Sequence, residues 1–537
     1  MSECFNGKPS DTKPSDNALH KRSIIKKTLQ VGGSTLLSRV LAIAREILLL
    51  RFLGGAGGIS DVFLMAYRIP NSFRKIFAEG ALSAATVPTL VKSIKSSGKD
   101  SVSSLMTLLF LVFEGAVLAL CAFVIWKAQW VMSVVAPGFS PEQVVLAVRW
   151  LRIFMPFILF LSSSALLAGA LQSLNRFFVP AISPALLNVV WIISLIACFT
   201  FDFPVETLCY FILFGGFLQF IFHLIAYFRL HFSFHKIDNE AWLSFGRVMM
   251  KFLPCLLSMS IVEVSLFVDS YFASYLQPGS ISLIYLANRF MGIPLGVFAT
   301  AFSTILLPHF SRISIYAPKR MSFYLLEATK FVFWIAVPVA FMMIYFSENI
   351  IYSFLFYTKK FSLVQVGEAS SILIAFLMGL FFFSLNKILL NVYYSFHNTW
   401  LPTIIAIFST VINFLLNRLL VQIFMATGIA LATTISAVIQ TILFLTFLHL
   451  FFKLRFYFFR FLEFFVRYML QLVCAFTFMI LVCKIIVKII PYFPELLSKF
   501  FLGPIGYWFW IGPIIIFTVA IIVHTRRFFK IKLHFMD

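Results

Sequence analysis

The chain has 537 residues, of which 61% are apolar and only 12% are charged. Long tracts of Phe, Leu and Ile between short polar breaks exclude a soluble globular protein and indicate a helical protein that crosses a membrane many times. The formal net charge of +22 does not indicate a nucleic-acid-binding domain, because the basic residues are spread over short loops. The positive-inside rule for cytoplasmic loops explains this distribution better.

The N-terminal residues 1–28 are polar and contain the near-repeat KPSDTKPSD. A cleaved signal peptide is not expected, because Arg39 interrupts the apolar stretch that follows and no small-residue cleavage site closes it. We therefore predict a disordered cytoplasmic tail over residues 1–28.

The first apolar run, from Leu36 to Leu53, contains charges that a membrane-spanning helix rarely carries. A guanidinium near the bilayer centre costs roughly 2.5–3.5 kcal/mol, so an intramembrane charge is by default a functional-site hypothesis. At about 100° per residue, the polar residues of this run gather on one side of a helix. They are Ser34, Thr35, Ser38, Arg39, Arg45 and Glu46. This pattern predicts an amphipathic spanning helix with one face toward a wet, cationic space.

The second apolar segment, 61–90, is also charged, and Pro70 interrupts it. At ~1.5 Å per residue it is longer than a hydrocarbon core of ~30 Å, which predicts a broken or protruding helix. Its polar residues include Asp61, Arg68, Asn71, Arg74, Lys75 and Glu79.

Apolar segments of spanning length number about fourteen along the chain. They are 34–53, 61–90, 104–135, 144–173, 179–201, 207–229, 248–276, 282–309, 326–355, 367–396, 401–423, 426–452, 462–490 and 506–525. If the N-terminus is cytoplasmic, most loop Lys and Arg residues fall inside, and an even number of spans leaves both termini there. The exceptions, on the outside, are Lys359, Lys360, Lys488 and Lys499.

A weak internal repeat relates the two halves of the chain, although the matches are few enough that chance remains an alternative. One constant offset pairs Gly58 with Gly279, Arg68 with Arg289 and Phe77 with Phe298. The offset covers an even number of predicted helices, so the halves would be parallel repeats with a site at the lobe interface, as in alternating-access transporters.

We therefore predict an all-α polytopic membrane protein with two parallel six-helix lobes and two further helices. The N-lobe covers residues 29–232 and the C-lobe residues 246–453. The last two helices cover 460–525, and a basic cytoplasmic tail covers 526–537.

Intramembrane charge concentrates in the first two segments and in the matching part of the second half. There, Arg289 lies in YLANRFMGIPLGVF, and Asp269 lies one predicted helix earlier. If the lobes face each other, four arginines would line one central cavity: Arg39, Arg45, Arg74 and Arg289. A guanidinium binds phosphate and carboxylate bidentately, so this cationic excess favours an anionic substrate such as a diphosphate.

The alternative is that these charges pair within the protein. Arg39 or Arg45 would pair with Glu46, Lys75 with Glu79, and Arg289 with Asp269. Because cations outnumber acids in these segments, pairing would still leave cations for a ligand.

Motifs for other chemistries are absent from the sequence. No Walker A, H-E-x-x-H or G-x-S-x-G motif occurs, so neither an ATPase nor a hydrolase is supported and no enzyme is expected. His231 and His235 lack an evident third metal ligand, and the seven cysteines include no C-x-x-C pair. We interpret the cysteines as small core residues.

Several segments carry a family resemblance. They are SRVLAIAREILLLRFLG (38–54), DVFLMAYRIPNSFRKIFAEGALSAATVPTL (61–90), APGF (136–139), NRFFVPAISPALLN (175–188), GGFLQ (215–219) and ANRFMGIPLGVF (287–298). These segments resemble the MurJ/MviN lipid II flippases. The resemblance implies fourteen helices in the two-lobed fold of the multidrug/oligosaccharidyl-lipid/polysaccharide exporter superfamily. It also implies transport of the undecaprenyl-diphosphate-linked peptidoglycan precursor from the inner to the outer leaflet of the bacterial cytoplasmic membrane.

The same resemblance matches Arg39, Arg45, Arg74 and Arg289 to the family's cavity arginines, and Asp61 to its characteristic acid. The last two helices would form a groove for the lipid tail. We expect five residues to support the site: Ser38, Glu46, Asn71, Glu79 and Asp269. Asn288 and Asn398 stand where the family often has acids, which argues against sodium coupling. No cofactor or metal is expected, and coupling to sodium or to the membrane potential stays open.

The leading hypothesis is a lipid II flippase of the bacterial inner membrane that works by alternating access. Its expected partners are lipid II, membrane lipids and other wall-synthesis proteins, with no nucleic acid. The alternatives are a drug/cation antiporter or another lipid-linked oligosaccharide exporter of the same superfamily, and a non-transporting scaffold for wall synthesis. An antiporter needs carboxylates that face the cavity, and the cationic excess argues against it.

Overall fold

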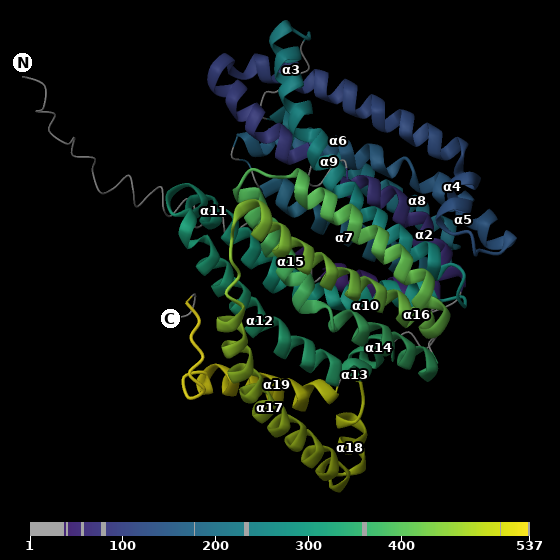
Figure 1. Ribbon diagram of the computed structural model, residues 1–537. Helices are drawn as coiled ribbons and strands as arrows, with labels where there is room; N and C mark the ends of the chain where they lie inside the picture. Colours follow the sequence, from purple (N-terminus) through teal and green to yellow (C-terminus); the bar gives the residue numbers. More distant parts are fainter. Residues whose placement is uncertain are drawn as a thin grey trace, which may run out of the picture. The chain divides into compact units, whose positions relative to one another are not determined.

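The computed structural model describes residues 37–38, 41–54, 58–76, 82–174, 176, 178–229, 236–356, 362–504 and 506–534 (Figure 1). The predicted tail at 1–28, Arg39, Glu79, His231, His235, Lys359 and Lys360 lie outside these residues. The described residues form helices and no strand. By internal packing the chain divides into two compact units. The first comprises Met1–Leu49, Phe73–Ile125 and Ile153–Phe252; the second comprises Leu50–Ser72, Trp126–Arg152 and Leu253–Asp537.

The first unit is built on close packing of apolar helices. Its principal helices are α3 (Leu82–Trp126), α6 (Phe157–Ser173), α7 (Phe178–Thr200) and α8 (Val205–Arg229). Helix α8 packs against both α6 and α7. Gly216 of α8 lies so close to α6 that a Cβ atom there would be 2.6 Å from the Phe157 ring. Small residues of this kind allow membrane helices to approach closely.

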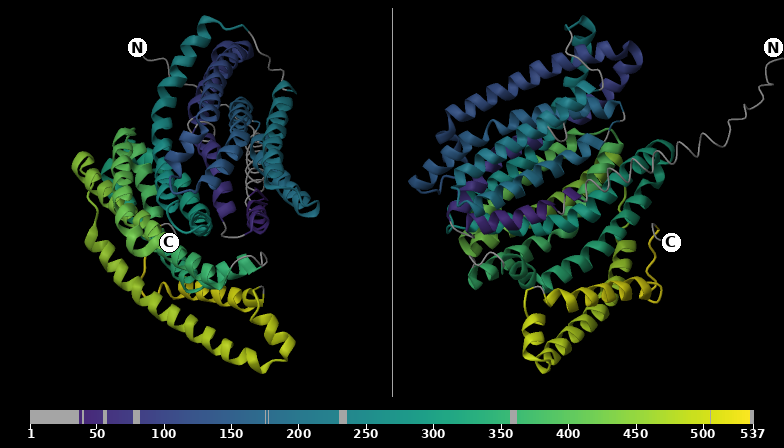
Figure 2. Two further views of the ribbon diagram at one scale, coloured as in Figure 1. Left: turned by 90° about the vertical axis from the view of Figure 1, so that its right-hand side faces the viewer. Right: turned by 180° about the vertical axis from the view of Figure 1, so that it is seen from behind.

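The second unit contains the remaining helices. They are α2 (Gly58–Arg74, mostly in this unit), α4 (Ala128–Val135), α5 (Pro141–Phe154), the end of α9 (Asn239–Ala273), α10 (Ser280–Pro294), the π-helix η2 (Leu295–Thr300), α11 (Ala301–Tyr316), η3 (Pro318–Arg320), α12 (Met321–Tyr345), α13 (Ser347–Phe356), α14 (Leu363–Leu377), α15 (Leu380–Ser395), α16 (Trp400–Phe452), α17 (Phe458–Ile489), η4 (Ile490–Tyr492), α18 (Glu495–Phe501) and α19 (Gly506–Thr525). Helices α17 and α19 lie side by side in both views of Figure 2. The side chains of Phe341 on α12 and Phe476 on α17 stack with ring centroids 3.8 Å apart.

In the described part of the chain, nine helices are long and apolar enough to cross a bilayer, or ten if the bent pair α14 and α15 is one span. The predicted spans at 401–423 and 426–452 form one helix, α16, with a kink at Met425. The predicted spans at 34–53, 61–90 and 248–276 are not among the nine, and all three carry charged residues. The prediction of an all-helical, multi-pass membrane protein is confirmed.

One predicted loop differs from the structure. The predicted spans 61–90 and 104–135 leave residues 91–103 as a loop between them, but helix α3 continues through these residues from Leu82 to Trp126. Lys has a good intrinsic helix propensity and Ser a moderate one, so a polar segment can extend a helix beyond its apolar part.

Candidate functional site

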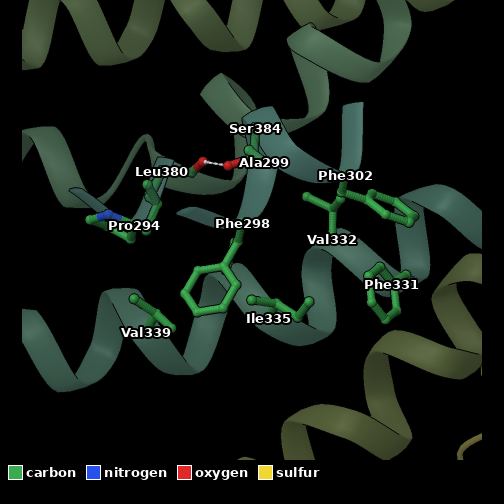
Figure 3. Close-up of a pocket in the computed structure, with 11 residues that line it drawn as sticks. Pro294, Phe298, Ala299, Phe302, Phe331, Val332, Ile335, Val339, Leu380 and Ser384 are labelled. Carbon is green, nitrogen blue, oxygen red and sulfur yellow. Dashed lines mark hydrogen bonds between the residues drawn. The ribbon is translucent and has the colours of Figure 1, made fainter. Parts of the chain in front are cut away.

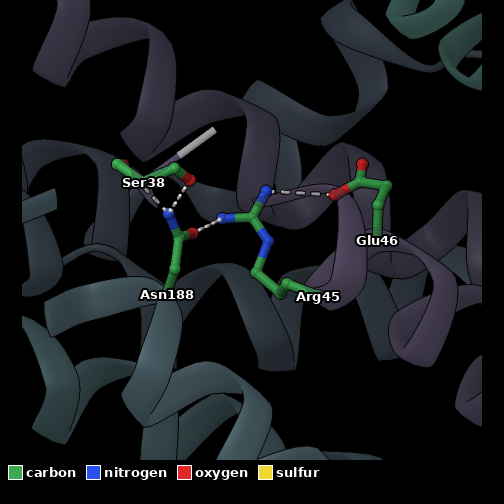
Figure 4. A network of polar contacts seen from close by, with 4 residues as sticks. All are labelled: Ser38, Arg45, Glu46 and Asn188. Atoms are coloured by element: carbon green, nitrogen blue, oxygen red, sulfur yellow. Dashed lines mark hydrogen bonds and ion pairs between the residues drawn. The ribbon is translucent and has the colours of Figure 1, made fainter. Parts of the chain in front are cut away.

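Arg45 is the centre of a buried polar network in the first unit (Figure 4). Its Nη1 donates to Asn188 Oδ1 at 3.0 Å, and its Nη2 donates to Glu46 Oε2 at 3.0 Å. Asn188 in turn donates from Nδ2 to the carbonyl oxygen of Ser38 at 3.1 Å. The guanidinium also lies 4.7 Å from the Trp191 ring centroid. Neighbouring groups therefore fix both the position and the plane of this cation.

The network realises one of the predicted internal pairs. Arg45 and Glu46 form an ion pair, and they are only 8% and 4% exposed. Removing one partner of a buried ion pair leaves an uncompensated charge, which is strongly destabilising. Asn188 was not among the predicted site residues, although it is a polar residue within the predicted span 179–201.

Asp61 occupies a different environment, in the second unit. Its Oδ2 accepts from the backbone N–H of Gly279 at 2.6 Å, and its Oδ1 accepts from that of Ser282 at 2.8 Å. The N-cap residue of α10 is Gly279, which has no side chain and a φ of 103°. Asp61 therefore caps α10 from another helix, and the positive end of the helix dipole favours its negative charge.

The rest of α2 is joined to α9 by polar contacts. Arg68 donates from Nη1 to the side chain of Ser270 and to the carbonyl oxygen of Leu266. Ser72 donates to Glu263 Oε2 at 2.6 Å. Glu263 was not among the predicted site residues, although it is the single charged residue of the apolar run SMSIVEVSLF.

Asp269 accepts its hydrogen bonds from neutral groups and does not pair with Arg289, as the alternative of internal pairing required. Its Oδ1 accepts from Asn417 Nδ2 at 3.0 Å, and its Oδ2 accepts from Thr433 Oγ1 at 3.3 Å. Asn417 Nδ2 also donates to Asn413 Oδ1 at 3.1 Å. Side chains on both sides of the kink in α16 therefore form hydrogen bonds with one carboxylate of α9.

The polar groups around Asp269 show whether a sodium ion would fit there. A hard cation prefers oxygen ligands, whereas the Nδ2 group of Asn417 points a hydrogen toward the carboxylate. This arrangement does not fit a bound cation, and we derive no step through sodium. Within the described ranges, no three His, Cys, Asp or Glu side chains are grouped as metal ligands.

The remaining predicted cations lie on different elements. Arg74 is the last residue of α2, is half-buried and belongs to the first unit. Arg289 is an exposed residue of α10 in the second unit, 5.8 Å from the Tyr285 ring centroid. Asn71 is half-buried on α2. A common cavity for the four arginines stays a prediction.

Sequence analysis also missed the cation Lys387. It lies in the apolar run FFFSLNKILLNV on α15. Its Nζ donates to Thr300 Oγ1 at 2.7 Å. A lysine alone in such a run carries the same energetic signal as the arginines of the first segment.

Similarity to known proteins decides the family. A family profile described as "Lipid II flippase MurJ" matches residues 52–504, which is most of the chain. The chain belongs to the lipid II flippase MurJ family. A protein from Burkholderia cenocepacia described as "Lipid II flippase MurJ" is 31% identical over 436 residues, covering 78% of this chain and 83% of the relative. A "Probable lipid II flippase MurJ" from Haemophilus influenzae is 33% identical over 433 residues, covering 76% and 83%.

Solved structures share the MurJ fold. A lipid II flippase MurJ in an inward closed conformation matches with a TM-score of 0.74 and 24% identity, covering 93% of this chain and 98% of that one. An inward-facing multidrug resistance MATE family transporter of the MOP superfamily matches with a TM-score of 0.64 and 16% identity, covering 76% and 93%.

These similarities confirm the predicted MurJ family and the predicted function. The protein is a lipid II flippase of peptidoglycan synthesis, a transporter and not an enzyme.

Proposed function

We propose that this flippase binds the diphosphate of lipid II through Arg39, Arg45 and Arg74 of an N-lobe at 29–232 and Arg289 of a C-lobe at 246–453. The lobes would alternate between inward-open and outward-open states in the bacterial inner membrane. Both termini would be cytoplasmic, as the distribution of Lys and Arg suggests.

The exposure of Arg289 carries this proposal. Arg289 is an exposed side chain within the apolar span Ser280–Tyr316. A guanidinium that faced lipid at this depth would cost several kcal/mol, so such a residue normally faces a wet cavity or a ligand. A phosphate group is an anion that would offset this charge and accept hydrogen bonds from the side chain.

Arg45 has a second part in the proposal. Because Asn188, Glu46 and Trp191 fix its orientation, its guanidinium loses little freedom when a phosphate arrives. Preorganisation of this kind lowers the cost of binding. Glu46 would moderate the positive charge, so that the site releases the lipid after transport.

Four intramembrane acids argue against the antiporter alternative. Glu46, Asp61, Glu263 and Asp269 are between 3% and 6% exposed. Each accepts a hydrogen bond from a protein group. A drug/cation antiporter requires acids that a cationic ligand can reach.

Assays that measure which leaflet contains lipid II, in cells depleted of their own flippase, test this proposal. We expect Arg289→Ala to slow export at least about tenfold, the loss of one charge-assisted contact, and to leave lipid II in the inner leaflet. Arg51→Ala is a matched control, because Arg51 is an exposed arginine at the end of its apolar run. Unchanged export by Arg289→Ala at normal membrane abundance would contradict the proposal and favour a scaffold role.

A further inference from the structure

An apolar pocket lies in the second unit between α10–η2–α11, α12 and α15 (Figure 3). It is a narrow groove: its cavity volume is about 20 Å³, and the space around it is partly open to the outside. Its lining includes Phe298, Phe302, Ile335, Val339 and Leu380, and Ser384 adds a polar atom. The Ser384 hydroxyl donates to the carbonyl oxygen of Leu380 at 2.7 Å, so its hydrogen-bonding need is met locally. The apolar lining therefore suits contact with a hydrocarbon chain that lies along the groove.

One wall of the pocket is an irregular helix. Pro294 ends α10, and residues Leu295–Thr300 form the π-helix η2 before α11 continues. A proline removes one backbone hydrogen bond and thereby favours such an interruption. Short π-helical segments inside α-helices occur frequently at functional sites.

A cation of α15 lies one turn beyond the lining residues. Lys387 follows Leu380 and Ser384 at helical spacing, so all three share one face of the helix. Its Nζ reaches across to Thr300, which adjoins the lining residue Ala299. In the described part of the chain, Lys387 forms no ion pair with a carboxylate. A cation inside a spanning helix without an acidic partner needs another anion to offset its cost.

The position of Lys387 along α15 distinguishes two lipid sources for that anion. Lys387 lies two turns before the end of α15 at Ser395, which is ~12 Å along the helix. Phospholipid headgroups stay in the interfacial layers outside the ~30 Å hydrocarbon core. The diphosphate of a lipid in translocation passes through the core. The position therefore favours the transported lipid over a bulk phospholipid.

We propose that Lys387 and this pocket form a further contact site for the polyprenyl diphosphate part of the substrate. The diphosphate is bound by Lys387 and the Thr300 hydroxyl, and a segment of the polyprenyl chain lies along the open groove between α12, α15 and η2. None of the lining residues belongs to α17 or α19, so the site differs from the predicted groove of the last two helices. The proposal rests on the proposed function, because it assumes that a polyprenyl diphosphate enters this protein.

Photolabelling of the purified full-length protein tests the site. The probe is a prenyl diphosphate with a diazirine at the far end of its chain. We expect labelled peptides from residues 294–302 and 331–339, and competition by unlabelled prenyl diphosphate. Prenyl alcohol or inorganic diphosphate should compete poorly, because each lacks one half of the ligand. Equal labelling by a diazirine phosphatidylglycerol would overturn the assignment in favour of a bulk lipid.

Variants of Lys387 show whether a loss of labelling comes from the missing charge or from a damaged fold. Lys387→Met should lower labelling about tenfold, the loss of one charge-assisted contact, and Lys387→Arg should retain most of it. Lys484→Met is a matched control, because Lys484 is an exposed lysine on the spanning helix α17. Thermal unfolding of each variant checks that the fold is intact. If Lys387→Met also melts early, Ala336→Phe, which fills the pocket and leaves the lysine in place, should abolish the pocket label.

The outcomes distinguish this site from the proposed function. Unchanged labelling of both Lys387→Met and Ala336→Phe overturns the site, whatever the export activity of Arg289→Ala. Reduced labelling of these variants, together with normal export by Arg289→Ala, supports the site and overturns only the arginine assignment.

Discussion

Arg45 and Arg289 are both guanidiniums in membrane-spanning segments, but their surroundings differ. Arg45 is 8% exposed and donates to both Asn188 and Glu46. Arg289 is exposed and lies near one aromatic ring. A buried guanidinium that donates to two acceptors depends on the planar fork of arginine. An exposed cation interacts mainly through its charge.

Lysine substitutions should separate these two roles. Arg45→Lys keeps the charge but cannot donate to Asn188 and Glu46 in the same geometry, so we expect at least about a tenfold loss of lipid II export. Arg289→Lys keeps the charge at an exposed position and should retain most of the activity. Export rates measured at equal membrane abundance provide the test. Equal retention by both variants would mean that the fork of Arg45 is dispensable.

At the scale of the element, α10 depends on a cap from another helix. Its N-cap residue is Gly279, and the acceptor for the first backbone N–H groups is Asp61 of α2. Asp61 is 3% exposed, so water cannot easily replace it. A long-range contact of this kind stabilises α10 and fixes α2 against it at the same time.

Asp61→Ala should therefore destabilise the protein. It leaves two backbone donors of α10 without their acceptor, at a cost of about 1–3 kcal/mol, and thermal unfolding in detergent should occur at a lower temperature. Asp238→Ala is a matched control, because Asp238 caps the exposed start of α9 through the N–H of Ala241. Since water can replace that cap, its effect should be smaller. Equal shifts in the two variants would contradict the role assigned to Asp61.

At the scale of the whole molecule, the two compact units alternate along the sequence. Residues 50–72 and 126–152 pack with the second unit, although both precede large parts of the first. The predicted lobes, 29–232 and 246–453, are continuous in sequence and stay a prediction. Their orientation in the membrane depends on the positive-inside rule.

Cysteine labelling tests that orientation. In a variant without the native cysteines, Phe203→Cys should react with a membrane-impermeant maleimide in intact cells, because 202–206 is a predicted outside loop. Lys236→Cys should react only after permeabilisation, because it lies in a predicted inside loop. Both positions are exposed, so accessibility in the folded protein does not limit the reaction. The reverse pattern would place both termini outside.

The sequence alone determined the fold class, the family and the intramembrane charges. Apolar segment length, loop charge and the block RIPNSFRKIFAEGA are local properties, and they can be read without knowledge of which helices pack together. The charged residues Arg45 and Asp61 were predicted as part of the site for the same reason.

Only the tertiary structure decided how those charges are satisfied. Asp269 binds Asn417 and Thr433 rather than Arg289, and Asp61 caps a helix distant in sequence. The proposed role of Lys387 depends on its hydrogen bond to Thr300 and on a pocket that three separate segments of the chain form. Each buried polar group must find a partner, and the packing of distant helices selects that partner among several candidates of suitable chemistry.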